Sequence, residues 1–454
     1  MEPRGRSTRA DRLSPVDTGS ATGRAIVLEP FLRRAAQKPK MPATQDTRPP
    51  DTRLDEAVGL ARAIDLDVVG SGVVALAAIT PATYIGKGKV EEIAGLVKTQ
   101  QAGIVVMDCA ISPVQQRNLE KAWSAKVLDR TGLILEIFGR RARTREGTLQ
   151  VEHAHLTYQK SRLVRSWTHL ERQRGGFGFL GGPGETQIEA DRRVIEERIA
   201  RIEAELEKVK RTRKLHRKSR KRVPYPIVAL VGYTNAGKST LFNQLTRASV
   251  LSADMLFATL DPTLRAVDLP HGARIILSDT VGFISDLPTM LIAAFRATLE
   301  EVIEADVILH VRDVSHEEAE AQSHDVEKVL RELGIEPNDR RLIEIWNKID
   351  RLTPERRGEL ANIAERRPGA RKPVLVSAVT GEGMEGLRVA IEAGVGASRV
   401  VQDVRLDPSD GAGVSWLHRH TEVLATTLSE DGKLKLTVRA EPATMERVKA
   451  KFAL

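Results

Sequence analysis

The chain has 454 residues, of which 41% are hydrophobic and only 4% aromatic, so it can form about three domains with mainly aliphatic cores. Its single cysteine excludes an intramolecular disulfide and a cysteine-based zinc cluster, which fits a reducing compartment. The net charge of +9 favours a polyanionic partner without requiring one, because a basic but ordinary enzyme can carry the same charge.

The first 22 residues are polar and basic, which predicts a disordered tail. They lack the apolar run of a secretory signal, and no later segment reaches the length of a membrane span. We therefore expect a cytoplasmic protein without a membrane anchor.

Strands and helices alternate between residues 23 and 132. The stretch 33–52 is rich in proline and polar residues, which predicts a loop. Apolar runs predict strands, and amphipathic stretches predict helices between them. The expected strands are 23–31, 68–79 and 103–108, and the expected helices are 54–64 and 90–100. This alternation predicts an α/β domain with a largely parallel sheet.

From residue 133 to residue 223 the apolar residues follow helical spacing. Two sets each form one stripe of an amphipathic helix. The first set is Leu149, Leu156, Leu163 and Leu170, and the second is Ile195, Ile199, Ile202, Leu206 and Val209. Two such helices joined by a loop should pack as an antiparallel hairpin, whose tip would be the glycine-rich stretch 175–185. The second helix ends in a strongly basic run before Pro224.

The tip has the composition of a loop that contacts RNA. Its glycines let the backbone approach phosphates, its phenylalanines can stack on splayed bases, and the neighbouring arginines can meet phosphates. The candidate RNA contacts are Phe177, Phe179, Arg172, Arg174, Arg192 and Arg193. The alternative is a flexible turn that packs back on its own domain. The tip also matches GxGxxG, but it neither follows a strand nor opens a βαβ unit, which excludes dinucleotide binding.

A phosphate-binding loop, GxxxxGK[ST], follows the apolar strand that begins near residue 227 and opens a helix. We expect Lys238 to bridge the β- and γ-phosphates and Ser239 to ligate Mg²⁺. The predicted nucleotide-binding residues of this loop are Gly232, Tyr233, Thr234, Asn235, Ala236, Gly237, Lys238, Ser239 and Thr240.

Further along, DTVG provides Asp279 for magnesium, usually through water, and Gly282, whose N–H can meet the γ-phosphate. Between the two motifs, LFATLDPTLR should hold a switch threonine that closes on magnesium and the γ-phosphate. We choose Thr259 for this role, with Thr263 as the alternative.

The motif NKID predicts specificity for guanine. Asp350 can accept two hydrogen bonds from the ring N–H and amino group of guanine, a donor pair that adenine lacks. Asn347 can brace the loop and the base edge, and Lys348 can stack on the ring. Ser377 and Ala378, which end the strand PVLVSA, would offer a backbone N–H to the guanine oxygen. Together these motifs predict a GTPase with GTP as its substrate.

Two residues bear on the rate of hydrolysis. Phe283 stands where many GTPases carry a glutamine that orients the attacking water, so hydrolysis should be slow without outside help. Asparagine at the position of Asn235 often ligates potassium beside the phosphates. The equally weighted alternative is that Asn235 only braces the loop.

The fold class is therefore α/β: an N-terminal α/β domain with a helical hairpin, then a doubly wound P-loop GTPase domain and a small α+β C-terminal domain. The last of these has expected strands at 421–429 and 433–440. We expect a disordered tail at 1–22, the N-terminal domain at 23–132, the hairpin at 133–223, the GTPase domain at 224–394 and the C-terminal domain at 395–454.

From about residue 23 onward the chain resembles the HflX family of translational GTPases. The resemblance rests on TYIGKGKVEEI, SPVQQRNLE, DRTGLILEIF, EGTLQVE, GPGETQIEADRR, VGYTNAGKST, LFATLDPT, DTVGFI and WNKID. It implies a cytoplasmic GTPase that associates with the large ribosomal subunit and splits stalled or idle ribosomes, notably under stress. It also implies that the tip points at the peptidyl transferase region, and that a phenylalanine after DxxG is normal. We expect a monomer.

The chain departs from the family at the tip, where GFGFLGGPGE is one residue longer and lacks the arginine that many members carry before GPGE. Two other functions remain open. One is a role in large-subunit assembly, and the other is a GTP-dependent switch for a non-ribosomal partner, in which the basic hairpin would be a solvated surface.

Overall fold

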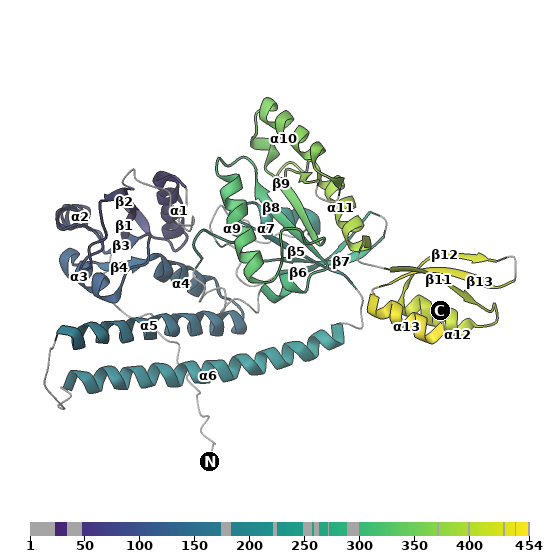
Figure 1. Cartoon of the computed structure of the whole chain (residues 1–454), viewed down its shortest axis with the longest axis horizontal. Helices are drawn as coiled ribbons and strands as arrows, with labels where there is room; N and C mark the ends of the chain where they lie inside the picture. The colour runs from purple at the N-terminus through teal and green to yellow at the C-terminus, as the bar shows by residue number, and fades with distance from the viewer. Residues whose placement is uncertain are drawn as a thin grey trace, which may run out of the picture. The chain divides into compact units, whose positions relative to one another are not determined.

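The computed structural model describes residues 23–33, 48–173, 183–220, 225–247, 257, 263–270, 272–287, 299–369, 372–397, 400–429, 432–440 and 442–452. The chain divides into two compact units (Figure 1). The first contains residues up to Arg140 and His155–Glu197, and the second contains Arg141–Ala154 and Arg198–Leu454.

The first unit contains a four-stranded, all-parallel sheet in the order β2-β1-β3-β4, as the alternating pattern predicts. Its strands are β1 (Arg24–Leu32), β2 (Asp67–Leu76), β3 (Ile104–Met107) and β4 (Lys126–Asp129). Its helices are α1 (Pro50–Arg62), α2 (Lys87–Gln100), α3 (Pro113–Trp123) and α4 (Arg130–Arg141). Ser112 and Gln115 form a capping box at the start of α3, which fixes where this helix begins.

The predicted hairpin consists of α5 (Arg145–Gln173) and α6 (Pro183–Arg220), so Pro183–Glu185, expected in the tip, begins the second helix. Ion pairs join the two helices within each unit. Lys160 pairs with Glu196 in the first unit. In the second unit Arg145 pairs with Glu205 and Glu152 pairs with Arg198, which shows that the helices run antiparallel there. Residues 174–182, which include most of the tip, lie outside the described part of the chain.

The second unit contains a six-stranded sheet in the order β10-β9-β8-β5-β7-β6. Its strands are β5 (Ile227–Gly232), β6 (Thr263–Asp268), β7 (Arg274–Asp279), β8 (Val307–Asp313), β9 (Leu342–Asn347) and β10 (Val374–Leu375). All neighbours are parallel except β6, which runs antiparallel to β7. The apolar runs IVALVG, ARIILSD, VILHVRD, RLIEIWN and PVLVSA predict the five parallel strands. Strand β6 is not predicted, and it lies at the end of the stretch expected to form a switch loop.

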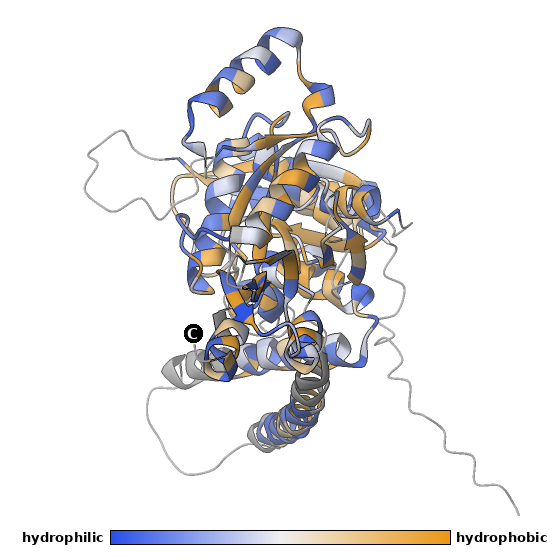
Figure 2. Ribbon diagram, turned by 90° about the vertical axis from the view of Figure 1, so that its right-hand side faces the viewer, coloured by the Kyte–Doolittle hydropathy of each residue, from blue (hydrophilic) through white to orange (hydrophobic). Residues whose placement is uncertain are grey.

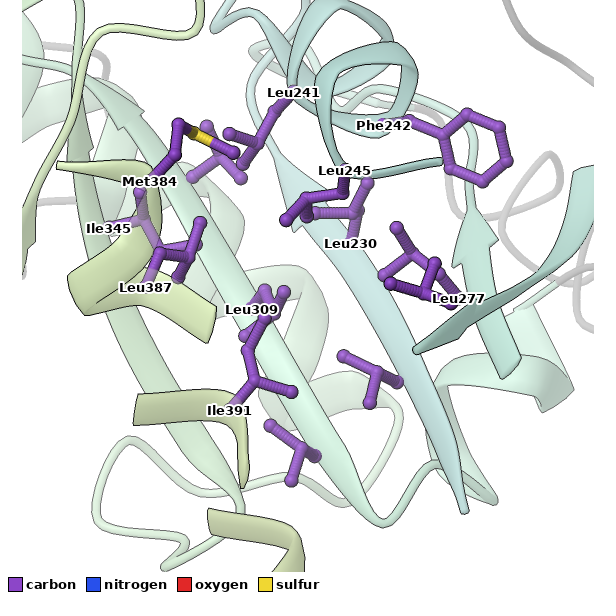
Figure 3. Close-up of a cluster of buried hydrophobic side chains, with 14 of the residues drawn as sticks. Leu230, Leu241, Phe242, Leu245, Leu277, Leu309, Ile345, Met384, Leu387 and Ile391 are labelled. Carbon is purple, nitrogen blue, oxygen red and sulfur yellow. The ribbon is translucent and has the colours of Figure 1, made fainter. Parts of the chain in front are cut away.

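Helices α7 (Lys238–Thr246), α9 (Ala319–Glu332), α10 (Pro354–Arg366) and α11 (Met384–Ala397) accompany this sheet. Figure 3 shows aliphatic side chains of α7 and α11, among them Leu241 and Leu387, packed on one face of the sheet against strand residues such as Leu309 of β8. Figure 2 shows the same distribution in hydropathy, with the central strands largely hydrophobic. This core fixes the carboxyl ends of the strands, where the predicted motifs lie.

A small α+β region follows, as predicted. Its antiparallel sheet has the order β11-β13-β12, with β11 (Val400–Leu406), β12 (Glu422–Leu428) and β13 (Leu434–Ala440). Side chains of α12 (Gly411–His420) and α13 (Pro442–Phe452) complete its apolar core. Within the described ranges of the whole chain, no helix combines the length and apolarity needed to cross a membrane.

Candidate nucleotide-binding site

The phosphate loop connects β5 to α7, and two of its glycines are required by close packing, one against backbone and one against a side chain. Gly232 has φ +152°, and a Cβ added there would lie 2.2 Å from the carbonyl oxygen of Val311 on β8. Gly237 has φ +91°, and a Cβ there would lie 2.3 Å from Nδ2 of Asn347. The loop can therefore approach β8 and the NKID motif only because these positions have no side chain.

Lys238 is the first residue of α7, and its ammonium group turns back over the loop. Nζ donates hydrogen bonds to the carbonyl oxygens of Tyr233 at 2.8 Å and of Gly232 at 3.1 Å. Burial lowers the pKa of this lysine to about 8, an effect that Asp279 opposes and Lys348 reinforces. A buried cation on the inside of such a loop is well placed to attract a phosphate.

Ser239 and Asp279 come together beside the loop. The hydroxyl of Ser239 donates a hydrogen bond of 2.8 Å to Oδ2 of Asp279, which is buried at the end of β7. A hydroxyl and a carboxylate are hard oxygen ligands of the kind Mg²⁺ prefers, and Mg²⁺ usually takes its other ligands from water and phosphate. The two side chains therefore fit the predicted magnesium site.

Gly282 lies directly against the phosphate loop. A Cβ at this position would come within 2.9 Å of Cγ2 of Thr234 and 3.0 Å of Nζ of Lys238. The next side chain, Phe283, is only 1% exposed and belongs to the protein interior. It therefore offers no polar group, and no exposed surface, that could orient a water molecule for attack.

Asn347, at the end of β9, joins two other parts of the site. Its Nδ2 donates to the carbonyl oxygen of Ala236 at 2.8 Å, and its Oδ1 accepts from the N–H of Ala378 at 3.0 Å. The predicted bracing of the loop is thus present as hydrogen bonds. The N–H of Ala378 thus donates to Asn347, and the N–H of Ser377 donates to the carbonyl oxygen of Glu382, so the predicted contact of these two residues with guanine stays a prediction.

The other NKID residues have distinct surroundings. Lys348 adopts φ +66°, and its Nζ pairs with Oδ2 of Asp313 at 2.7 Å. Asp350 lies in a short 3-10 helix, Ile349–Arg351, and is exposed. The sequence does not predict the role of Asp313. Its signal was an aspartate that ends the buried strand VILHVRD, at the edge where the other motifs meet.

The remaining phosphate-loop candidates lie in or beside the loop. Asn235 is exposed with φ +59°, and Thr240 follows Ser239 on α7. Thr263 starts β6 opposite Asp279, so the alternative switch threonine belongs to a strand. Thr259, the preferred switch threonine, lies outside the described residues.

The structure brings few of the RNA candidates into view. Arg192 and Arg193 are exposed on α6, and Arg192 pairs with Glu196 at 3.0 Å. Arg172 belongs to helix α5, but its side chain lies outside the described part of the structure. The residues Arg174, Phe177 and Phe179 lie outside it entirely. The predicted RNA contacts of the tip therefore stay predictions.

A phosphate loop on a mainly parallel sheet, a DxxG glycine packed against it and an NKID asparagine that braces it define a P-loop GTPase. Matches to family models cover most of the chain. They are GTP-binding GTPase N-terminal at 51–139, GTP-binding GTPase Middle Region at 141–220, 50S ribosome-binding GTPase at 227–348 and HflX C-terminal domain at 362–452.

Two relatives match most of the chain. The chain is 51% identical to GTPase HflX of Magnetococcus marinus over 95% of this chain and 96% of that protein. It is 45% identical to GTPase HflX of Escherichia coli over 82% and 87% of the two chains. A solved complex of SsGBP with GDP, 23% identical, covers 82% of this chain and 97% of that chain with a TM-score of 0.47. The chain belongs to the HflX family of GTPases.

Proposed function

We propose that this GTPase binds the large ribosomal subunit in the cytoplasm and, as a monomer, splits stalled or idle ribosomes under stress. The observation that carries the proposal is the hairpin that precedes the GTPase domain in the chain: 29 residues in α5 and 38 in α6, which ends in a basic run. A long cationic hairpin suits ribosomal RNA, because arginine and lysine bind phosphates. The family model that matches 227–348 is described as a 50S ribosome-binding GTPase, which supports the same partner.

In the proposed nucleotide cycle, the phosphate loop, residues 232–240, wraps the phosphates with its N–H groups, and Lys238 neutralises charge on the β- and γ-phosphates. Ser239 and Asp279 hold Mg²⁺, which supplies charge stabilisation when bound, and Thr259 closes on the same site as the switch. The 2.8 Å contact between Ser239 and Asp279 supports this pairing of ligands. The exposed carboxylate of Asp350 selects guanine, with Lys348 stacked on its ring.

Hydrolysis is proposed to be slow in the isolated protein and faster on the ribosome. Gly282 donates its N–H to the γ-phosphate, but the buried Phe283 cannot orient water. The large subunit then orders the switches or supplies charge, and potassium held by Asn235 contributes to the rate. The exposed position of Asn235 beside the loop supports the potassium role over the bracing role.

Light scattering of intact ribosomes mixed with the protein and GTP tests the proposal. Scattering should fall as subunits separate, and GTP hydrolysis by the protein should rise when large subunits are added. Replacing Phe177 and Phe179 with alanine should impair binding or splitting and leave GTP binding intact, because these rings are proposed to stack on RNA bases.

Other outcomes separate the alternatives. Co-sedimentation with large subunits without any fall in scattering would favour a role in subunit assembly. No co-sedimentation with either GTP or a non-hydrolysable analogue would favour a switch for a non-ribosomal partner. If the double variant splits ribosomes as well as the parent, the tip is only a turn.

A further inference from the structure

The second residue of the phosphate loop makes a contact that the motif does not require. The hydroxyl oxygen of Tyr233 accepts a hydrogen bond of 2.8 Å from the N–H of Ser285, three residues beyond Gly282. Tyr233 is 5% exposed and Ser285 is 4% exposed, so this bond is shielded from water. The motif GxxxxGK[ST] accepts any residue here, and an apolar side chain could fill the space but could not accept this bond.

Backbone hydrogen bonds join the same two segments. The N–H of Thr234 donates to the carbonyl oxygen of Phe283 at 2.7 Å, and the N–H of Phe283 donates to the carbonyl oxygen of Gly232 at 3.1 Å. Tyr233 and Phe283 are paired as an isolated parallel bridge. Together with the bond to Tyr233, these contacts fasten the segment after DxxG along the start of the phosphate loop.

These hydrogen bonds also restrain the position of Gly282, because this glycine directly precedes Phe283 in the chain. A Cβ at Gly282 would lie 3.0 Å from Nζ of Lys238, so its backbone is held where the lysine meets the loop. Donors that stabilise a transition state act best when they are positioned before the reaction, and small displacements cost rate.

We infer that Tyr233 is a positioning residue for GTP hydrolysis, whose hydroxyl holds the Gly282 N–H in place for the γ-phosphate. The inference rests on the proposed role of Gly282. Tyr233 acts through the segment that ends at Ser285, and it need not touch the nucleotide.

A positioning role and a merely structural role differ in their effect on GDP. GDP has no γ-phosphate, so displacing Gly282 should leave its affinity unchanged while it slows hydrolysis of GTP. A general weakening of the loop, in contrast, would lower the affinity for GDP together with the rate, because the loop also binds the remaining phosphates.

The test is Tyr233→Phe in the full chain, which removes only the hydroxyl. Tyr225→Phe is the matched control, because Tyr225 lies in the same unit, is 42% exposed and has its ring under the guanidinium of Arg274. Single-turnover GTP hydrolysis should fall about fivefold or more in the Tyr233 variant, as expected when a buried N–H loses its acceptor. The affinity for GDP should stay within about twofold, and the control should match the parent in both.

An unchanged rate, or an equal loss of rate and of GDP affinity, would overturn the inference. Gly282→Ala separates it from the proposed function: if this variant hydrolyses GTP normally, the role of Gly282 is wrong. If Gly282→Ala is impaired but Tyr233→Phe is not, only the role of Tyr233 fails.

Hydrogen exchange decides the case in which Tyr233→Phe does not bind GDP at all. In the nucleotide-free parent, the amide of Ser285 should exchange slowly, because it is buried and bonded to Tyr233. Exchange at the rate of an unprotected amide would overturn the inference.

Discussion

Replacing Asn347 with alanine should weaken nucleotide binding strongly, although this side chain's described contacts are with protein atoms. The change removes the donor to the carbonyl oxygen of Ala236 and the acceptor for the N–H of Ala378, and all three residues are buried. Each buried group left without a partner costs about 1–3 kcal/mol, so the two together cost about 2–6 kcal/mol. Expressed entirely in affinity, this is a loss of about 30-fold to about 2 × 10⁴-fold.

Part of this cost will appear as lower domain stability, so the assay must measure both quantities. We would titrate fluorescent GDP to obtain the affinity and unfold the nucleotide-free protein with urea to obtain its stability. Asn118→Ala is the matched control, because Asn118 lies partly exposed in the first unit and donates a hydrogen bond to the carbonyl oxygen of Ala82. The affinity of this control for GDP should equal that of the parent.

The variant Asn347→Asp sharpens the test. Aspartate can still accept from Ala378, but it sets a carboxylate oxygen against the carbonyl oxygen of Ala236, so its loss should be at least as large as that of alanine. If the summed loss in affinity and stability is below about 1 kcal/mol for both variants, the bracing role of Asn347 is refuted.

Three further predictions concern the nucleotide. Lys238 has a pKa of about 8 without ligand, and bound phosphates favour its charged form, so GDP affinity should fall by up to about tenfold per pH unit above pH 8; equal affinities by titration at pH 7 and pH 9 would contradict this. Asp350→Asn inverts the acceptor pattern and should shift the preference from guanine to xanthine nucleotides, as measured by competition binding. Tight GTP binding retained in this variant would contradict the assignment. Potassium should support faster hydrolysis than sodium in the parent but not in Asn235→Ala, and equal parental rates in the two salts would remove Asn235 as a ligand.

Much of the fold was predictable from hydrophobic periodicity and from the residues that end helices and strands. Buried parallel strands such as β8 are continuous apolar runs, and the helices between them carry clear amphipathic stripes. Strand β6 gave no such signal, because TLRAVD mixes polar and apolar residues. The strand lies at the sheet edge, and three of its six residues are exposed. Strand β11 is similar, since most of VVQDVRL is exposed and only its pairing with β13 makes it a strand.

The motifs predicted that Lys238, Ser239 and Asp279 lie together at the phosphate loop, because a motif fixes both residue and context, while their roles toward nucleotide and magnesium stay predictions. The site was not predictable where function depends on long-range pairing of residues outside the motifs. Asp313 meets Lys348 only because β8 and β9 are neighbours, and the hydroxyl of Tyr233 meets Ser285 only because the two segments lie side by side. The bond from the N–H of Ala378 to Asn347 was likewise not predictable from the motifs, and the contact of Ser377 and Ala378 with guanine stays a prediction.

The bonds of Asn347 also set an order of events during synthesis of the chain. Ala236 and Asn347 are 111 residues apart, and Ala378 follows 31 residues later. At about 5–20 residues per second, roughly 5–20 s pass between translation of the phosphate loop and translation of the residue that braces it. During that interval Asn347 has not yet been synthesised, so it cannot donate a hydrogen bond to the carbonyl oxygen of Ala236 in the nascent loop. GTP can therefore first stabilise the domain only when nearly all of it has been made, which delays ligand-assisted folding to the end of translation.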